Sequence, residues 1–392
     1  MKRLWAILLA MCMLCTGCGW VEGSYQSVTP HRQHSDGGET TIEAADSYLQ
    51  LRTALENMVL SGTETSVISV GEIPQERLED FLDMAVRYVR DTFPMGAYAV
   101  EDIYCEIGTV GGTTALAVEI QYLHERQEIL SVLQVDNMDE ARKLIGNALT
   151  QYQPGLVMLI EDYQLTDIHQ LVEDFAVENP GDLMEIPETT VQLFPSSGHQ
   201  RVLELKFSYQ SSRDSLRAMG DVVQRVFNSA ALYVSHDASD SQKLSQLYAF
   251  LMERFGEYQL KTSITPAYSL LNHGVGDSKA FAVVSAEMCQ RAGVECRVVV
   301  GTRLGEPWCW NLVMEDGSYY HVDLLNCRQL GGYIPMTDGQ MGDYVWDYSA
   351  YPACPDPAVV QVDLPENSET QGEETVPPTE PPTSEPPENT EN

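Results

Sequence analysis

The sequence has few basic residues and no long apolar segment beyond its N-terminus. Its 392 residues include 23 Lys and Arg against 58 Asp and Glu, a formal net charge of −35. Residues 46–354 contain 44 acidic and 20 basic residues, so this part alone carries −24. Such a chain repels the phosphates of nucleic acids, which argues against a nucleic-acid-binding protein. The lack of later apolar runs excludes a bundle of transmembrane helices.

Cysteine motifs typical of metal sites are also missing beyond the N-terminal region. No CxxC pair and no Cys/His cluster there has the spacing of metal ligands, so we predict no metal and no cofactor. An even number of cysteines permits disulfides in an exported protein without specifying them, and free buried cysteines are an equal alternative. The six are Cys105, Cys289, Cys296, Cys309, Cys327 and Cys354.

The N-terminus "MKRLWAILLAMCMLCTGC" has the layout of an export signal. Two basic residues precede a short apolar stretch that is too short for a comfortable transmembrane helix. Its end, "LCTGC", resembles the lipobox of bacterial lipoproteins, although Cys15 stands where leucine is usual. The resemblance implies that residues 1–17 are a signal peptide and that Cys18 is lipidated, which would anchor the protein to the cell membrane, facing outside the cytoplasm. The alternative is an ordinary secretory signal.

Both ends of the chain are predicted to lie outside any folded domain. Residues 18–45 are polar and rich in Gly, Ser and Thr, which is typical of a flexible tether. Residues 355–392 are acidic and rich in Pro, Thr and Glu, with ten acids and no Lys or Arg. Such a segment buries too little apolar surface to offset its ordering entropy, so we predict a disordered tail.

Two stretches between these ends follow the same pattern about ninety residues apart. "SVISV" at 66–70 and "LVMLI" at 156–160 are candidate strands, and each precedes a stretch with the apolar spacing of an amphipathic helix. Alternating apolar residues at 116–122 recur at 203–209, and a further helical pattern closes each copy, at 141–148 and 219–226. We therefore predict an α+β protein with tandem βαββα modules at 46–152 and 153–238; chance similarity is the alternative.

The pattern changes after residue 240. An amphipathic helix with a Ser/Asp start is followed by "TPAYSLLNHG", in which Thr265 is a candidate N-cap, Pro266 begins the helix and Gly274 ends it. The next predicted helix runs from Ser278 to Ala292. Three strands are predicted after it, in "CRVVVG", "WCWNLV" and "YYHVDLL".

This order of elements resembles the transglutaminase-like superfamily, whose domain has a papain-like core. The matching stretches are "GDSKAFA", "AGVECRVVVG", "WCWN" and "DGSYYHVD", within residues 240–354. Active members have a cysteine nucleophile at the helix start, a histidine base on a strand and an aspartate on the next strand. The resemblance places Ser278, Trp308 and Asp323 at these positions, so only the aspartate is kept.

The resemblance therefore implies a degenerate catalytic triad. A serine hydroxyl needs a positioned base, whereas the Trp308 indole offers one N–H donor and no titratable group. Asp277 adds a negative charge beside Ser278. Cys309 is predicted to point away from the face of Trp308, and His321, which shares the face of Asp323, is the remaining candidate base.

The sequence favours a cell-surface lipoprotein whose non-catalytic transglutaminase-like domain is a binding or assembly module for peptides or cell-wall material. The alternative is an active cysteine-protease-like or transglutaminase enzyme with a non-standard residue set. A third hypothesis is an architectural protein whose tandem modules space the last domain from the membrane.

Overall fold

The computed structural model describes residues 43–258 and 263–356. The predicted signal peptide with Cys18, nearly all of the tether and the tail beyond Asp356 lie outside the described residues. Contacts divide the chain into two units. The second holds Gly146–Gln153, Asp167–Thr189 and the chain from Phe207 onward, and the first holds the rest. No helix in the described ranges is both long enough and apolar enough to cross a membrane.

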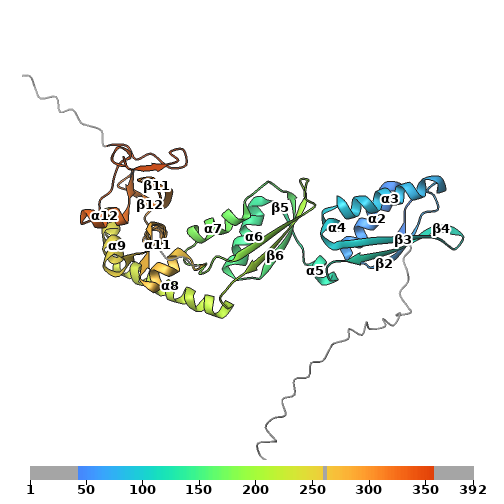
Figure 1. The fold of residues 1–392 in the computed structure, drawn as a ribbon, viewed down its shortest axis with the longest axis horizontal. Helices are drawn as coiled ribbons and strands as arrows, with labels where there is room; N and C mark the ends of the chain where they lie inside the picture. Colours follow the sequence, from blue (N-terminus) through green and yellow to red (C-terminus); the bar gives the residue numbers. More distant parts are fainter. Residues whose placement is uncertain (1–42, 259–262, 357–392) are drawn as a thin grey trace, which may run out of the picture. The chain divides into compact units, whose positions relative to one another are not determined.

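Two four-stranded sheets precede the C-terminal domain (Figure 1), and both have the same strand order, β1-β2-β4-β3 and β5-β6-β8-β7. In each, a short first strand pairs in parallel with the second, which pairs antiparallel with the last. The first sheet is formed with β1 (Glu43–Ala44), α2 (Tyr48–Ser61), β2 (Thr65–Ser69), α3 (Gln75–Asp91), α4 (Pro94–Ala99), β3 (Val100–Val110) and β4 (Thr113–Tyr122). The second follows with α5 (Arg126–Leu130), β5 (Leu133–Asn137), α6 (Met138–Thr150), β6 (Gly155–Asp162), α7 (Ile168–Glu178), β7 (Glu188–Phe194) and β8 (Arg201–Ser208).

The predicted boundary at 152/153 falls inside the second set of elements. Strand β5 pairs with β6, so α6 stands between two strands of one sheet, as α2 stands between β1 and β2. The helical pattern at 141–148 therefore opens the second set, rather than closing the first, because its strand partner β5 was not recognised. The α+β class is confirmed, whereas the βαββα repeat stays a prediction, since equal strand order alone does not establish two copies of one unit.

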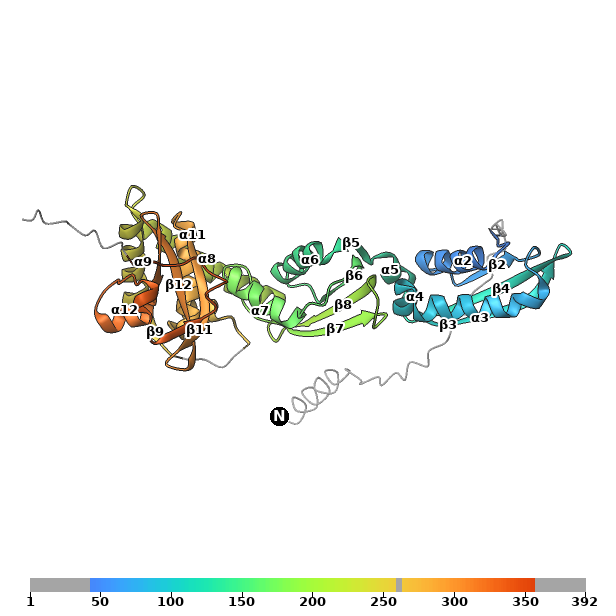
Figure 2. The ribbon, with the colours of Figure 1, turned by 90° about the horizontal axis from the view of Figure 1, so that it is seen from above.

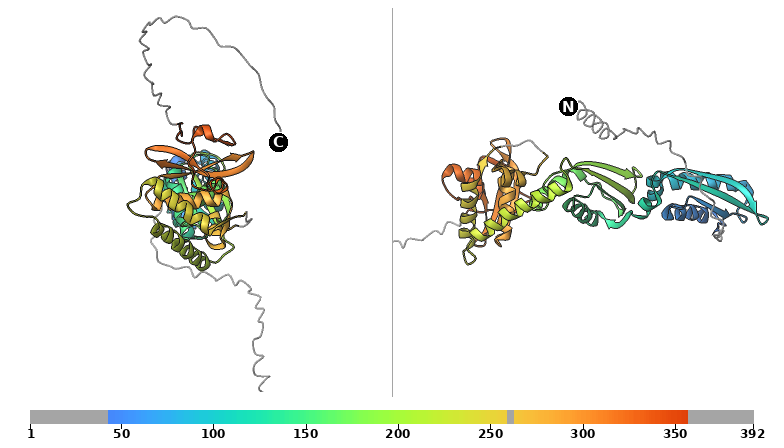
Figure 3. Two further views of the ribbon diagram at one scale, coloured as in Figure 1. Left: turned by 90° about the vertical axis from the view of Figure 1, so that its left-hand side faces the viewer. Right: turned by 90° about the horizontal axis from the view of Figure 1, so that it is seen from below.

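The C-terminal domain combines five helices with a sheet ordered β13-β12-β11-β14. Figure 3 shows its first helix, α8, as one long uninterrupted helix. The helices are α8 (Arg213–Tyr233), α9 (Asp240–Arg254), α10 (Pro266–His273), α11 (Ser278–Arg291) and α12 (Leu324–Leu330). The strands are β9 (Gly256–Glu257), β10 (Val275–Gly276), β11 (Cys296–Arg303), β12 (Glu306–Glu315), β13 (Ser318–Val322) and β14 (Tyr344–Trp346), with a 3₁₀ turn at Asp338–Gln340.

Helix α11 is the centre of this domain and packs along β11 and β12 (Figure 2). Its residues from Ala280 to Ser285 are all buried, which is typical of a helix covered on most sides. Asp277 caps its N-terminus by accepting from the amide of Ala280 at 2.9 Å. The preceding turn uses Gly274 at φ 76°, a left-handed conformation that favours glycine.

Two sequence expectations for this domain need correction. The predicted strand at 319–325 ends at Val322, because the Asp323 side chain caps α12 by accepting from the amides of Leu325 and Asn326. The predicted start at 240 also lies too late. Helix α8 packs on α10 and α11, and its Gln224 accepts a hydrogen bond from Arg291 at 3.0 Å. The long amphipathic pattern of α8 concealed that this helix contributes to the C-terminal core.

Candidate functional site

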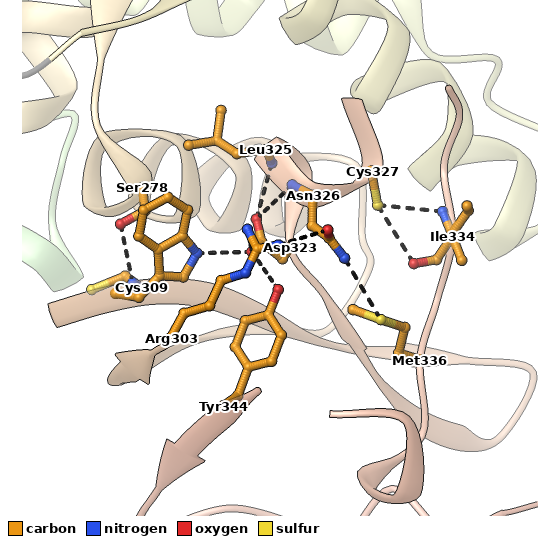
Figure 4. Close-up of polar contacts among 11 residues, drawn as sticks. Ser278, Arg303, Cys309, Asp323, Leu325, Asn326, Cys327, Ile334, Met336 and Tyr344 are labelled. Atoms are coloured by element: carbon orange, nitrogen blue, oxygen red, sulfur yellow. Dashed lines mark hydrogen bonds and ion pairs between the residues drawn. The ribbon is translucent and has the colours of Figure 1, made fainter. Parts of the chain in front are cut away.

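Ser278 is the first residue of α11 and faces the start of strand β12. The residue is 8% exposed, and its hydroxyl accepts a hydrogen bond from the backbone amide of Cys309 at 3.2 Å (Figure 4). Asp277, rather than Ser278, accepts from the free amides of the helix start. Among the described residues, no imidazole, carboxylate or amine is hydrogen-bonded to the Ser278 hydroxyl. A serine nucleophile requires a base that accepts its hydroxyl proton, and this geometry provides none.

Trp308 is hydrogen-bonded to Asp323. Its indole Nε1 donates to Asp323 Oδ2 at 2.8 Å, the contact that the resemblance assigns to an imidazole. The hydroxyl of Tyr344 donates to the same oxygen at 2.7 Å, while Oδ1 accepts from two amides of α12 at 3.0 and 3.1 Å. Asp323 is buried, with 1% of the residue exposed, and each of its carboxylate oxygens has two donors (Figure 4). Its capacity for hydrogen bonds is filled without a histidine.

Arg303 balances the buried charge of Asp323. Its Nη1 lies 3.6 Å from Asp323 Oδ2, and its Nη2 donates to Asn326 Oδ1 at 2.9 Å. The guanidinium also lies 5.5 Å from the ring centroid of Trp308 and 5.3 Å from that of Tyr344, within cation–π range. Burial, followed by the charge of Asp323, raises the pKa of Tyr344, so this hydroxyl stays a neutral donor. The carboxylate is thus fully hydrogen-bonded and paired with a charge, whereas Arg303 Nε is buried without a hydrogen-bond partner among the described residues.

His321 cannot act as the base for Ser278. Its Nδ1 accepts from the Trp310 indole at 2.9 Å, and its Nε2 lies 2.9 Å from Asp338 Oδ1. Because an indole only donates, Nδ1 is unprotonated, Nε2 carries the proton and donates it to the carboxylate. The side chain is fully buried, and burial lowers its pKa against the opposing effect of Asp338. Both ring nitrogens are thus engaged away from Ser278.

Cys309 is next to the serine but has no feature that would activate it. Its side chain is 8% exposed, and burial raises the pKa of the thiol to about 11, with Lys279 lowering it and Asp277 raising it further. The thiolate is the nucleophilic form, so this cysteine is almost entirely unreactive at neutral pH. Its thiol has no imidazole partner among the described residues. Each of the six cysteines in the described ranges is a free thiol.

One cluster in the described part of the chain has the composition of a metal site. Single ligand atoms of His321, Asp338 and Cys354 lie within 4.8 Å of one another. A histidine that binds a metal through Nε2 carries its proton on Nδ1 and donates it to a second partner. Here Nδ1 faces the N–H of Trp310, so a proton on Nδ1 would place two hydrogen-bond donors opposite each other. The cluster therefore does not fit a metal ion.

The structure brings Ser278, Trp308 and Asp323 to one corner of the domain, between the start of α11 and the sheet. Sequence reasoning missed Arg303 and Tyr344, which complete the environment of Asp323. Tyr344 lies on β14, a three-residue strand that has no clear periodic signal. The tryptophans of "WCWN" were a usable clue, because a buried indole needs an acceptor, here Asp323 for one and His321 for the other.

A family model described as the transglutaminase-like superfamily matches residues 229–336. The match begins within α8 and ends before β14. No curated protein sequence matches this chain.

Three solved structures are similar in part. A protein titled as a TGase is 10% identical, with 56% of this chain and 63% of that chain covered and a TM-score of 0.24. A candidate cysteine protease from Cytophaga hutchinsonii is also 10% identical, with coverages of 41% and 70% and a TM-score of 0.24. A candidate protease from Parabacteroides distasonis is 8% identical, with coverages of 66% and 39% and a TM-score of 0.21. This chain spans less than two thirds of the length of the first of these chains.

Proposed function

Given that residues 229–336 form a transglutaminase-like domain, we propose that this domain is non-catalytic and serves as a binding or assembly module for peptides or cell-wall material. The contact between Trp308 and Asp323 carries the proposal. The carboxylate that would orient a catalytic imidazole instead accepts from an indole, a hydroxyl and two amides. An imidazole has no place in this arrangement, and no other residue of the described ranges offers Ser278 a base.

The same contacts explain how the buried Asp323 is stabilised in a domain without catalytic activity. A buried carboxylate is costly unless it is hydrogen-bonded and paired with a charge, and Asp323 has both kinds of partner. Through Oδ1 it also caps α12, while Oδ2 joins β12 to β14. Asp323 thus keeps a structural role that does not depend on a nucleophile or a base.

We further propose that the protein is a lipoprotein on the outer side of the cell membrane, anchored through Cys18. The "LCTGC" sequence and the polar stretch after it support this placement. One acyl chain binds a membrane only marginally, so stable anchoring would require at least a diacylglyceryl group.

The purified chain tests the proposal in two assays: incorporation of a fluorescent primary amine into casein, and cleavage of casein followed by mass spectrometry. The proposal expects no turnover above that of the Ser278→Ala variant. Turnover by the wild type that Ser278→Ala abolishes would instead support the active enzyme, with serine as its nucleophile.

A further inference from the structure

A second concave surface, within the second unit of the chain, lies away from the corner of Ser278. This groove, of about 540 Å³, is lined by α11, by β11 and by the end of α7. Val283, Ala286 and Gln290 of α11 line it, and they follow Ser278 by five, eight and twelve residues, or about 8 to 18 Å along the helix. Neither Ser278 nor Asp323 lines the groove, which is therefore a different surface from the corner.

Strand β11 borders the groove with an open edge. Strand β12 pairs with it along its whole length, whereas β14 pairs only with Gly301–Arg303. On the β12 side, the carbonyl of Glu295 accepts from Met314 at 2.9 Å. Because hydrogen-bonding direction alternates along an antiparallel strand, the backbone groups of Val298 and Val300 point to the open edge. The edge of β11 is therefore available for strand pairing before Gly301, where its pairing with β14 begins.

Two observations show that this edge lacks a strand partner. The amide of Val300 donates to the hydroxyl of Tyr351 at 3.3 Å, a side chain in place of a strand. The amide and carbonyl of Val298 have no backbone partner on that side within residues 43–258 and 263–356. Unpaired backbone groups on a sheet edge are a template for a further extended chain.

The side chains of the groove are apolar along the strand and acidic opposite it. Val298 and Val300 line it from β11, and Val300 is 61% exposed. Asp174 and Glu178 line it from α7, both exposed and neither in an ion pair among the described residues. The other charged side chains in the lining are already paired within the protein: Glu287 with Arg291 at 2.6 Å, and Arg297 with Glu295 at 2.9 Å. The uncompensated charge is negative.

We propose that this groove binds an extended basic peptide, which adds to the edge of β11 as a strand and places Lys or Arg side chains against Asp174 and Glu178. The proposal rests on the proposed function and names its surface and ligand chemistry. The negative charge of the groove favours a basic peptide over two other candidate occupants, the segment 357–392 and a second copy of the chain. The segment 357–392 has nine acids and no Lys or Arg, and a second copy would bring another body of charge −24. Both would be repelled by the groove.

The test uses the full chain and a fluorescein-labelled hexapeptide, Val-Lys-Val-Lys-Val-Lys, with fluorescence polarisation at low salt. We expect saturable binding that weakens as salt is added, and at least tenfold weaker binding of the Val-Glu counterpart. N-methylation of either the valine or the lysine amides separates strand addition from simple charge attraction. In a paired strand only alternate amides face the partner, so one methylated set should abolish binding and the other should not.

Two variants locate the peptide. Glu178→Gln should weaken binding roughly two- to fivefold, while Glu173→Gln, an exposed acid of the same helix outside the groove, should not change it. Val298→Pro removes an amide that points to the open edge, so β11 keeps its bonds to β12. This variant should weaken binding about threefold to tenfold and keep the circular dichroism spectrum of the wild type.

Each outcome supports or contradicts peptide binding in the groove, whether or not the protein has catalytic activity. Absence of binding at millimolar peptide, equal binding of the Val-Lys and Val-Glu peptides, or equal loss in Glu178→Gln and Glu173→Gln would each overturn it. Binding that is lost in Ser278→Ala but kept in Val298→Pro would move the peptide to the corner and overturn the groove. None of these results bears on turnover, which tests the non-catalytic assignment.

Discussion

The indole nitrogen of Trp308 lies 2.8 Å from Oδ2 of Asp323, so the base position of the predicted triad is hydrogen-bonded to the aspartate position through a group that cannot act as a base. The same oxygen accepts from Tyr344, and Arg303 supplies a positive charge at 3.6 Å. At this corner of the transglutaminase-like domain, the carboxylate of Asp323 thus has a full set of hydrogen-bond donors. Its energetic role can be measured one donor at a time.

Removal of the Tyr344 hydroxyl should destabilise the domain. Tyr344→Phe leaves a buried carboxylate short of one donor, which should lower the free energy of unfolding by about 1–3 kcal/mol. Urea unfolding followed by tryptophan fluorescence reports on this domain, since Trp308, Trp310 and Trp346 all lie in it. The control is Tyr319→Phe, whose hydroxyl donates at 2.8 Å to the exposed Glu295 and should cost under about 1 kcal/mol. Equal losses would show that Asp323 does not depend on this donor.

Ser278 should contribute to stability through its acceptor role. Ser278→Ala leaves the amide of Cys309 without its hydrogen-bond acceptor, and we expect a loss of about 1–3 kcal/mol in the urea experiment. Asp277→Ala, which removes the helix cap, should cost about 0.5–2 kcal/mol. A neutral Ser278→Ala would mean that the hydroxyl is not used structurally, and would weaken the non-catalytic interpretation.

His321 should make stability depend on pH. Burial lowers its pKa in the folded state below the unfolded value of about 6.5, so the unfolded chain binds the proton more readily. Its contribution is complete above about pH 6.5 and is lost as the pH falls through the lowered pKa of the folded state. Between pH 7.5 and 5, the wild type should lose more stability than His321→Gln does.

His169→Gln is the matched control for this effect, because His169 is exposed on α7. It should follow the wild-type pH curve. If His321→Gln also followed that curve, the buried Trp310–His321–Asp338 chain would not carry a neutral imidazole.

The anchor prediction concerns Cys18. Cys18→Ala should shift the protein from the membrane fraction to the soluble or secreted fraction, and mass spectrometry of the wild-type N-terminus should show a diacylglyceryl cysteine. Membrane association that is unchanged in the variant would contradict a lipid anchor at this residue.

Sequence motifs predicted more of the residues of this site than the periodicity of apolar residues did. Thr265, Pro266 and Gly274 delimited α10 correctly, because caps and a helix-starting proline are local signals. The positions of Ser278, Trp308 and Asp323 followed from motif order, and the structure brings them to one corner.

The partners of Asp323 could not be predicted in this way. Tyr344 reaches it from a three-residue strand, and Arg303 from the far end of β11, so neither has a local signature. The role of Asp323 as the cap of α12 was missed because "YYHVDLL" reads as one uninterrupted strand. The predicted boundary between the first two sheets was wrong for a related reason. Strand β5 pairs with β6 across a helix, and the spacing of apolar residues does not reveal a parallel partner.

No base stands beside position 278 among the described residues, and the pH dependence of a thiol at that position measures this directly. In Ser278→Cys, with iodoacetamide labelling at residue 278 followed by peptide mass spectrometry, the reaction should have a midpoint at or above the ordinary cysteine pKa of about 8.5. Ser278→Cys combined with Trp308→His should lower that midpoint, because Asp323 could then hold an imidazolium near the thiol. A midpoint below about pH 7 in Ser278→Cys alone would contradict the account, since it would reveal a base that the structure does not place there.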